Sequence, residues 1–89
     1  MGMMITRFKV KDYSAWRTVF DANEAMRKAA GISNPRILRS ADDASELVII
    51  FDDLETSKAK EFAGSEDLKE VMMKAGVIDI PTFYFLESI

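Results

Sequence analysis

Two short apolar runs constrain the fold more than any other feature of this sequence. Residues 47–51 read Leu-Val-Ile-Ile-Phe and residues 83–86 read Phe-Tyr-Phe-Leu, and their β-branched and aromatic side chains favour strands. Successive residues of a strand point to opposite faces of a sheet, so both faces of these two strands are apolar. Strands of this kind are typical of sheets covered on both faces. The fold must therefore cover two faces of one sheet.

The N-terminal half of the sequence predicts a strand followed by a long helix. Residues 3–10 alternate between apolar and polar side chains, and the basic Arg7 and Lys9 share one face. Asp12 can cap the helix, and Gly31 suits the position just after its last turn. Apolar residues recur along this helix every three or four positions. They are Tyr13, Trp16, Val19, Phe20, Met26 and Ala30.

A hairpin is predicted in the middle of the chain. Asn34-Pro35 favours an extended start, and residues 36–40 then form a strand. The short polar side chains of residues 41–45 are typical of a turn, and they join this strand to residues 47–51.

The next segment predicts a helical region in two pieces and a last strand. Asp53 is expected to cap a short helix that runs through Ala63, and Ser65 to cap a second piece that Gly76 ends. Residues 82–86 follow as the last strand. The order β-α-β-β-α-β is that of a ferredoxin-like α+β fold, formed by a single domain over residues 1–89.

This order leaves one face of the four-stranded antiparallel sheet without a cover. Right-handed crossovers place both helical regions on the same face. Leaving about four large apolar side chains wet on the other face would forgo on the order of 6–12 kcal/mol, at roughly 1.5–3 kcal/mol each. We therefore predict a homodimer whose two sheets pack face to face. A monomer with an irregular open face is the alternative.

Composition excludes several classes of function. Twelve Lys and Arg against fifteen Asp and Glu give a formal net charge of −3, so the basic surplus that nucleic-acid binding needs is missing. The chain has no Cys and no His, which removes the usual thiolate and imidazole metal ligands and nucleophile–imidazole pairs. No apolar run has the length of a membrane span, and residues 1–4 do not resemble a signal peptide. We expect a cytoplasmic protein without nucleic-acid partner, membrane, metal or cofactor.

Three acidic pairs could suggest a metal site or acid–base chemistry. They are Asp42-Asp43, Asp52-Asp53 and Glu66-Asp67. Each has a simpler role in a turn, a helix cap or the first turn of a helix. We predict no metal site.

The sequence resembles the dimeric α+β barrel superfamily, and within it the small antibiotic-biosynthesis-monooxygenase-like proteins. The resemblance covers almost the whole chain, and it is carried by residues 8–16, 39–43, 52–55, 75–77 and 83–87. It implies a dimeric barrel with a ligand between the sheet and the helices. Members of this family include enzymes that oxidise a substrate with O2 and no cofactor, using the substrate's own electrons, and the resemblance implies this kind of chemistry.

Asn23 is the most informative candidate for a site residue. It lies seven positions after Trp16, about two helical turns, within an apolar stripe. Asn23 could polarise a substrate carbonyl or enolate while Trp16 shapes the cavity, and Tyr84 could add a phenol to the cavity or to the dimer face. Phe20 lies in the same stripe and is a candidate ligand contact. The alternative is that Asn23 bonds the backbone and the aromatic residues are core.

Arg7 and Arg39 are the remaining candidates for ligand binding. They fall on strands that are neighbours or nearly so, and together they could hold a carboxylate or phenolate. The alternative is that both are solvated strand charges.

The function expected from these features is binding of a small apolar or aromatic molecule, with cofactor-independent oxidation of a phenol or enol as the chemistry. Two alternatives stay open: a non-catalytic ligand-binding or stress-related dimeric module, and a proton-transfer isomerase on the same scaffold. A cavity of a few hundred Å³ lined by Asn23 and Trp16 favours ligand chemistry, because ligand sites have volumes of roughly 300–1,000 Å³. A filled cleft favours the non-catalytic module.

Overall fold

The structure, a computed structural model that describes residues 2–89, contains four strands and four helices in the order β-α-α-β-β-α-α-β. The strands are β1 (Gly2–Lys9), β2 (Arg36–Arg39), β3 (Glu46–Leu54) and β4 (Thr82–Glu87), and the helices are α1 (Tyr13–Ala22), α2 (Glu24–Ala29), α3 (Thr56–Ala63) and α4 (Glu66–Lys74). The strands form one antiparallel sheet in the order β2-β3-β1-β4. The predicted ferredoxin-like α+β class is confirmed.

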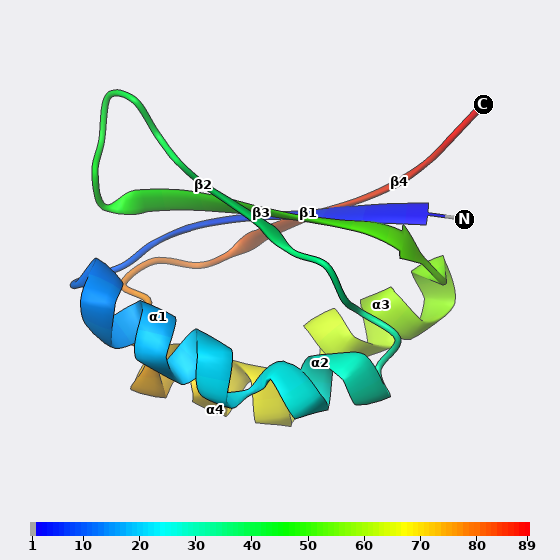
Figure 1. Ribbon diagram of the computed structural model, residues 1–89, viewed down its shortest axis with the longest axis horizontal. Helices are drawn as coiled ribbons and strands as arrows, with labels where there is room; N and C mark the ends of the chain where they lie inside the picture. Colours follow the sequence, from blue (N-terminus) through cyan, green and yellow to red (C-terminus); the bar gives the residue numbers. More distant parts are fainter. Residues whose placement is uncertain (1) are drawn as a thin grey trace.

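All four helices lie on the same side of the sheet (Figure 1). The side chains beneath them come from alternate positions of the two central strands, where Thr6, Phe8, Leu47 and Ile49 are buried. The core lies between the two layers. Its members are Met4, Phe8, Val10, Trp16, Ile32, Leu47, Ile49, Phe51, Leu54, Ala59 and Ala75.

The other face of the sheet is apolar as well, as the sequence predicts. Val48 and Ile50 are half-buried, whereas Tyr84 is 54% and Leu86 45% exposed. Within residues 2–89 no helix covers this face (Figure 1). The homodimer stays a prediction, because the structure contains one copy of the chain.

Local side-chain chemistry fixes several helix ends. Asp12 caps α1 by accepting a hydrogen bond from the Ala15 N–H, and Ser65 caps α4 through the Leu68 N–H. Gly31 and Gly76 have φ values of +76° and +83°, a conformation that glycine adopts without steric cost. These four positions are confirmed as predicted.

Among the residues that the structure describes, no helix is long and apolar enough to cross a membrane.

The expected cap at Asp53 is wrong. Asp53 belongs to β3, and Glu55 occupies the position before α3. The register between β1 and β3 shifts here, because Gly2 pairs with Leu54 while Met4 pairs with Phe51. Asp53 has a φ of +53°, and aspartate tolerates this left-handed conformation in a β-bulge. The strand therefore continues past the position at which the sequence suggested a helix start.

The turn between β2 and β3 holds a carboxylate in its charged form. Asp43 Oδ1 accepts hydrogen bonds from the Ser45 hydroxyl at 2.6 Å and from the Ser45 N–H at 2.9 Å. Lys9 Nζ lies 3.1 Å from Asp43 Oδ2. The Ser45 hydroxyl first, then the Ser45 N–H and Lys9, lower the pKa of Asp43 from 3.8 to about 2.

We predict that Asp43→Ala lowers the urea midpoint near neutral pH and that this loss shrinks as the pH falls from 3.8 to about 2. A carboxylate whose pKa is depressed by folding stabilises the fold above its unfolded-state pKa, and that stabilisation disappears through the folded pKa. Urea unfolding at several pH values measures it. Asp42→Ala is the control, because the Asp42 carboxylate takes no part in the Ser45 bonds. If the loss of urea midpoint in Asp42→Ala shrank at low pH in the same way, the assignment of this stabilisation to the Asp43 carboxylate would be contradicted.

Candidate functional site

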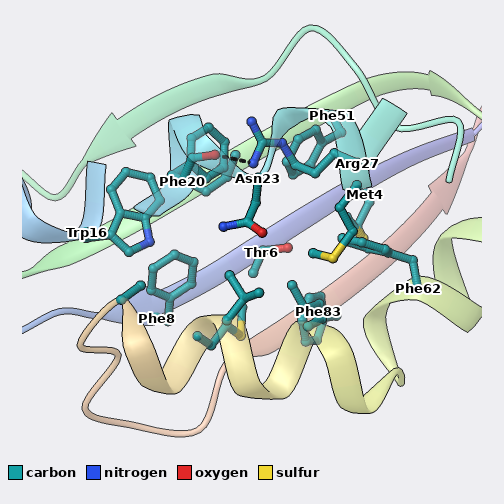
Figure 2. A pocket seen from close by; sticks show the side chains of 16 residues that line it. Met4, Thr6, Phe8, Trp16, Phe20, Asn23, Arg27, Phe51, Phe62 and Phe83 are labelled. Atoms are coloured by element: carbon teal, nitrogen blue, oxygen red, sulfur yellow. Dashed lines mark hydrogen bonds between the residues drawn. The ribbon is translucent and has the colours of Figure 1, made fainter. Parts of the chain in front are cut away.

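A cavity of about 60 Å³ lies between the sheet and the helices. Figure 2 shows the 16 side chains that line it. Six of them are aromatic: Phe8, Trp16, Phe20, Phe51, Phe62 and Phe83. Besides the indole N–H of Trp16, polar groups come from Thr6 of β1, Asn23 at the junction of α1 and α2, and Arg27 of α2. The cavity is thus an aromatic chamber with polar groups concentrated beside one helix junction.

Trp16 forms the centre of an aromatic cluster on one wall. It is 3% exposed, and its ring centroid lies 4.8 Å from that of Phe20 in a stacked arrangement and 5.8 Å from that of Phe8. Trp16 and Phe20 lie four residues apart on α1, so their side chains share one face of the helix. This wall of the cavity is therefore aromatic.

Asn23 interrupts the helix that the sequence predicts from Asp12 to Ala30. Its backbone N–H bonds the Phe20 carbonyl at 3.2 Å, and its Nδ2 bonds the Val19 carbonyl at 2.8 Å. Asparagine competes with the helical backbone for hydrogen bonds in this way. The expectation of one unbroken helix is wrong at this residue, since α1 ends at Ala22 and α2 begins at Glu24.

The Asn23 carboxamide also faces the cavity. Figure 2 shows it pointing from the helix junction toward Thr6. An amide nitrogen carries two N–H donors, and the Val19 carbonyl accepts from one of them. Within residues 2–89 the second N–H of this amide has no hydrogen-bond acceptor.

Arg27 is buried beside the same junction and is 7% exposed. Its Nη1 donates a hydrogen bond to the Phe20 carbonyl at 2.6 Å, and its guanidinium carbon lies 3.7 Å from the Phe20 ring centroid. Burial lowers the pKa of Arg27, while Glu24 and Asp21 act in the opposite direction. A desolvated cation thus lies in the cavity wall.

Thr6 supplies a buried hydroxyl with no partner. The residue is 3% exposed, and no protein atom of residues 2–89 accepts from or donates to its Oγ1. Thr6 lies on the central strand between Ile49 of β3 and Phe83 of β4. A buried hydroxyl without a partner costs roughly 1–3 kcal/mol.

The structure brings three of the six predicted site residues together. Trp16, Phe20 and Asn23 all line the cavity. Tyr84 does not, because it pairs with Ile5 on the open face of the sheet and is 54% exposed.

Arg7 and Arg39 do not form the clamp that the sequence suggested. Arg39 pairs with Leu47, so it belongs to the helix-covered face, where its guanidinium carbon lies 4.7 Å from the Tyr13 ring centroid. Arg7 pairs with Val48 and lies on the open face, where it bonds the carboxylates of Glu46 and Asp79. The joint ligand site is wrong because the register puts the two arginines on opposite faces.

Sequence reasoning missed Arg27 and Thr6. Arg27 lies four residues after Asn23 and seven after Phe20, so it continues the stripe that holds the other cavity residues. A charged residue in such a stripe is the signal that could have identified it. Thr6 is a polar member of the alternation that otherwise predicts the covered face of β1.

Similarity to known proteins appears in structure rather than in sequence. No protein-family model and no curated protein matches the chain. An antibiotic-biosynthesis-monooxygenase-like protein from Bordetella bronchiseptica matches with a TM-score of 0.78 and 13% identity over 99% of this chain and 96% of that one. One from Caulobacter crescentus matches with a TM-score of 0.73 and 16% identity over 99% and 89%.

A third match is SnoaB, a cofactor-independent oxygenase from Streptomyces nogalater. Its TM-score is 0.72, with 13% identity over 99% of this chain and 92% of that one. These likenesses confirm, at the level of fold, the resemblance that the sequence carries. The chain has the ferredoxin-like α+β fold of antibiotic-biosynthesis-monooxygenase-like proteins.

We predict that Thr6→Val stabilises the ligand-free protein by about 1 kcal/mol, because valine keeps the shape and removes an unpartnered buried hydroxyl. Urea unfolding at constant slope measures the change. The control is Thr18→Val on the exposed side of α1, where the hydroxyl already bonds the Ser14 carbonyl and the expected change is within about 0.5 kcal/mol. A lower midpoint for Thr6→Val would show that the hydroxyl has a partner in solution.

Proposed function

We propose that this chain binds a small phenol or enol in the cavity and oxidises it with O2, without a cofactor. The observation that carries the proposal is the aromatic chamber in which Thr6, Asn23 and Arg27 converge. The fold is also that of SnoaB, a cofactor-independent oxygenase.

The polar groups suit an electron-rich, oxygen-bearing substrate. Phenolate and enolate oxygens are stabilised by hydrogen-bond donors held in a water-poor site. Asn23 has an amide N–H available, Thr6 a hydroxyl, and Arg27 a guanidinium, while the Trp16 and Phe20 rings can stack on an aromatic substrate. These groups would hold the substrate oxygen and fix the ring.

The oxidation balances without a bound redox group. A phenol that becomes a quinone gives four electrons to O2, one oxygen atom enters the ring and the other leaves as water. No carboxylate, lysine or tyrosine lines the cavity within residues 2–89. The chain therefore favours a substrate acidic enough to reach the cavity as its anion, and it lacks the positioned base that a proton-transfer isomerase uses.

A non-catalytic binding module is the second candidate, and the cavity volume favours it. About 60 Å³ accommodates on the order of four water molecules, which is less than the few hundred Å³ expected for ligand chemistry. An aromatic ligand would have to displace Met4, Met26 or Met72 from the lining. Methionine side chains are unbranched and adapt readily, so a ligand could enter in either case. The two candidate functions therefore differ in whether turnover follows binding.

A second copy of the chain is the cover that we propose for the open sheet face. Large apolar side chains lie exposed there on β4 and β2, with Tyr84, Leu86 and Leu38 each at least 45% exposed. The nearby charges are already paired within the chain, as Arg7 is with Glu46 and Asp79. Packing two such faces together would bury apolar area without stranding these charges.

We predict that sedimentation velocity at micromolar concentration shows particles of twice the 10.0 kDa chain mass. Tyr84→Lys should weaken this dimer at least about ten-fold, because each copy would bring a lysine charge into the apolar interface. Met73→Lys is the control, since Met73 is 72% exposed on α4, away from the open face. Stable native particles of single-chain mass for the unmodified protein would rule out the dimer.

We predict O2-dependent turnover of at least one member of a panel of acidic phenols and quinols. Asn23→Ala should lower that turnover by about 10²-fold, the typical effect of removing one donor from a developing oxyanion. Oxygen uptake and product absorbance measure it, circular dichroism verifies the fold, and Thr18→Ala on the exposed helix face is the control. Unchanged turnover in Asn23→Ala would exclude its role. Binding without turnover would favour the non-catalytic module.

A further inference from the structure

We propose that the cavity selects anions, and that Arg27 is the residue that recognises the charge of the ligand. This inference rests on the proposed function and narrows its substrate to an aromatic monoanion, whose charged oxygen lies against the guanidinium while its ring lies among the aromatic side chains.

Arg27 is buried without an ion-pair partner. No carboxylate of residues 2–89 lies within ion-pair distance of it, whereas Arg7, Arg17 and Arg36 each pair with an acidic side chain. Those three arginines are more exposed than Arg27. Arg39 also has no acidic partner within residues 2–89, but it is exposed. Arg27 is therefore the one arginine of the described chain that is both buried and without an ion pair.

The contacts of Arg27 neutralise its charge only in part. The Phe20 carbonyl lies near the C-terminus of α1, where the helix dipole is negative, and the Phe20 ring faces the cation. Both contacts are weaker partners for a guanidinium than a carboxylate. The lowered pKa of Arg27 comes chiefly from its burial. An anion in the cavity would supply the missing charge.

A purely structural role does not require a charge at the position of Arg27. A neutral side chain with an N–H donor could satisfy the Phe20 carbonyl at the helix junction without burying a charge. Among the lining side chains of the described chain, Arg27 is the only one with a formal charge. The guanidinium lies against the Phe20 ring, and Phe51 lines the same cavity (Figure 2). A flat anion with a ring matches both the charge and the walls.

Trp16 provides the measurement, because it is the only tryptophan of the chain and it lines the cavity. The probes are 4-nitrophenol, which ionises near neutral pH, and 4-nitroanisole, its methyl ether, which cannot ionise. Quenching of Trp16 fluorescence gives each affinity, with N-acetyltryptophanamide as the correction for light absorbed by the probe. The phenolate should bind at least about ten-fold more tightly than the ether, the effect of one charge-assisted hydrogen bond. The bound phenol should also ionise at lower pH than the free one.

Arg27→Met tests the residue, and Lys28→Met is the matched control. Lys28 is the next residue of α2, its side chain is 64% exposed, and its loss changes the net charge equally. Arg27→Met should abolish the preference for the phenolate while leaving the affinity for the ether within about three-fold, and Lys28→Met should keep the preference. A structural role alone would lower both affinities together, which would overturn the inference.

The wild-type measurements decide the question even where Arg27→Met does not fold. Equal binding of phenolate and ether, with no shift in the ionisation of the bound phenol, overturns anion selection but leaves aromatic binding intact. Quenching by neither probe overturns the inference together with the proposed ligand site. Phenolate selectivity without O2-dependent turnover supports anion recognition and sinks only the oxidation.

Discussion

Apolar contact between one face of the sheet and the four helices is the interaction on which the rest of the structure depends. Within the covered face, Thr6 of β1 pairs with Ile49 of β3 on one side and with Phe83 of β4 on the other. An isosteric apolar side chain at this point would add to the hydrophobic stabilisation, yet the chain places an unpartnered hydroxyl there. The sheet thus gives up stability at the same position where the cavity opens. Buried polar groups of this kind are rare in native structures and call for a specific explanation, and a ligand oxygen supplies one.

The helix break ties the cavity to the backbone. Ending α1 at Ala22 frees the carbonyl oxygens of Val19 and Phe20 from their usual helical partners, and a buried carbonyl without a donor is costly. The Asn23 amide satisfies the first, and the Arg27 guanidinium shares the second with the Asn23 N–H. The two side chains that repair the break are also the two polar groups that this helical segment presents to the cavity. Their positions are therefore fixed by backbone hydrogen bonds, which leaves little freedom to reorient when a ligand enters.

The sequence predicts those parts of this structure that depend on local chemistry and periodicity. Alternation correctly separates the faces of β3, and short polar side chains correctly mark the caps at Asp12 and Ser65. The prediction fails where a distant partner decides the outcome. The bulge at Asp53 follows from pairing with β1, and the separation of Arg7 from Arg39 follows from strand register, which periodicity within one strand cannot supply. For the site, helical spacing is sufficient to predict that Trp16, Phe20 and Asn23 lie together. The sequence does not predict that Arg27 belongs to the site, because charged residues normally indicate the solvent-exposed face of a helix. Only tertiary packing shows that Arg27 is buried.

Arg7 and Arg27 differ in how their charges are balanced, and this difference supports the two separate roles that we propose for the open face and the cavity. Arg7 lies on the apolar open face, but Glu46 and Asp79 neutralise it, so a second apolar surface can approach without desolvating a lone charge. Arg27 belongs to α2 above the covered face, where a ring and a carbonyl contact it and no carboxylate of residues 2–89 pairs with it, although Glu24 and Asp21 act on its charge from further away. A face whose charges are internally balanced suits the apolar protein partner that we propose. A cavity whose one cation has no ion pair suits the small anion that we propose. Arginines lie both on the open face and beside the cavity, but of these two places only the open face holds carboxylates paired with an arginine, as beside Arg7. The positions of the carboxylates therefore distinguish the surface that suits assembly from the cavity that suits a ligand.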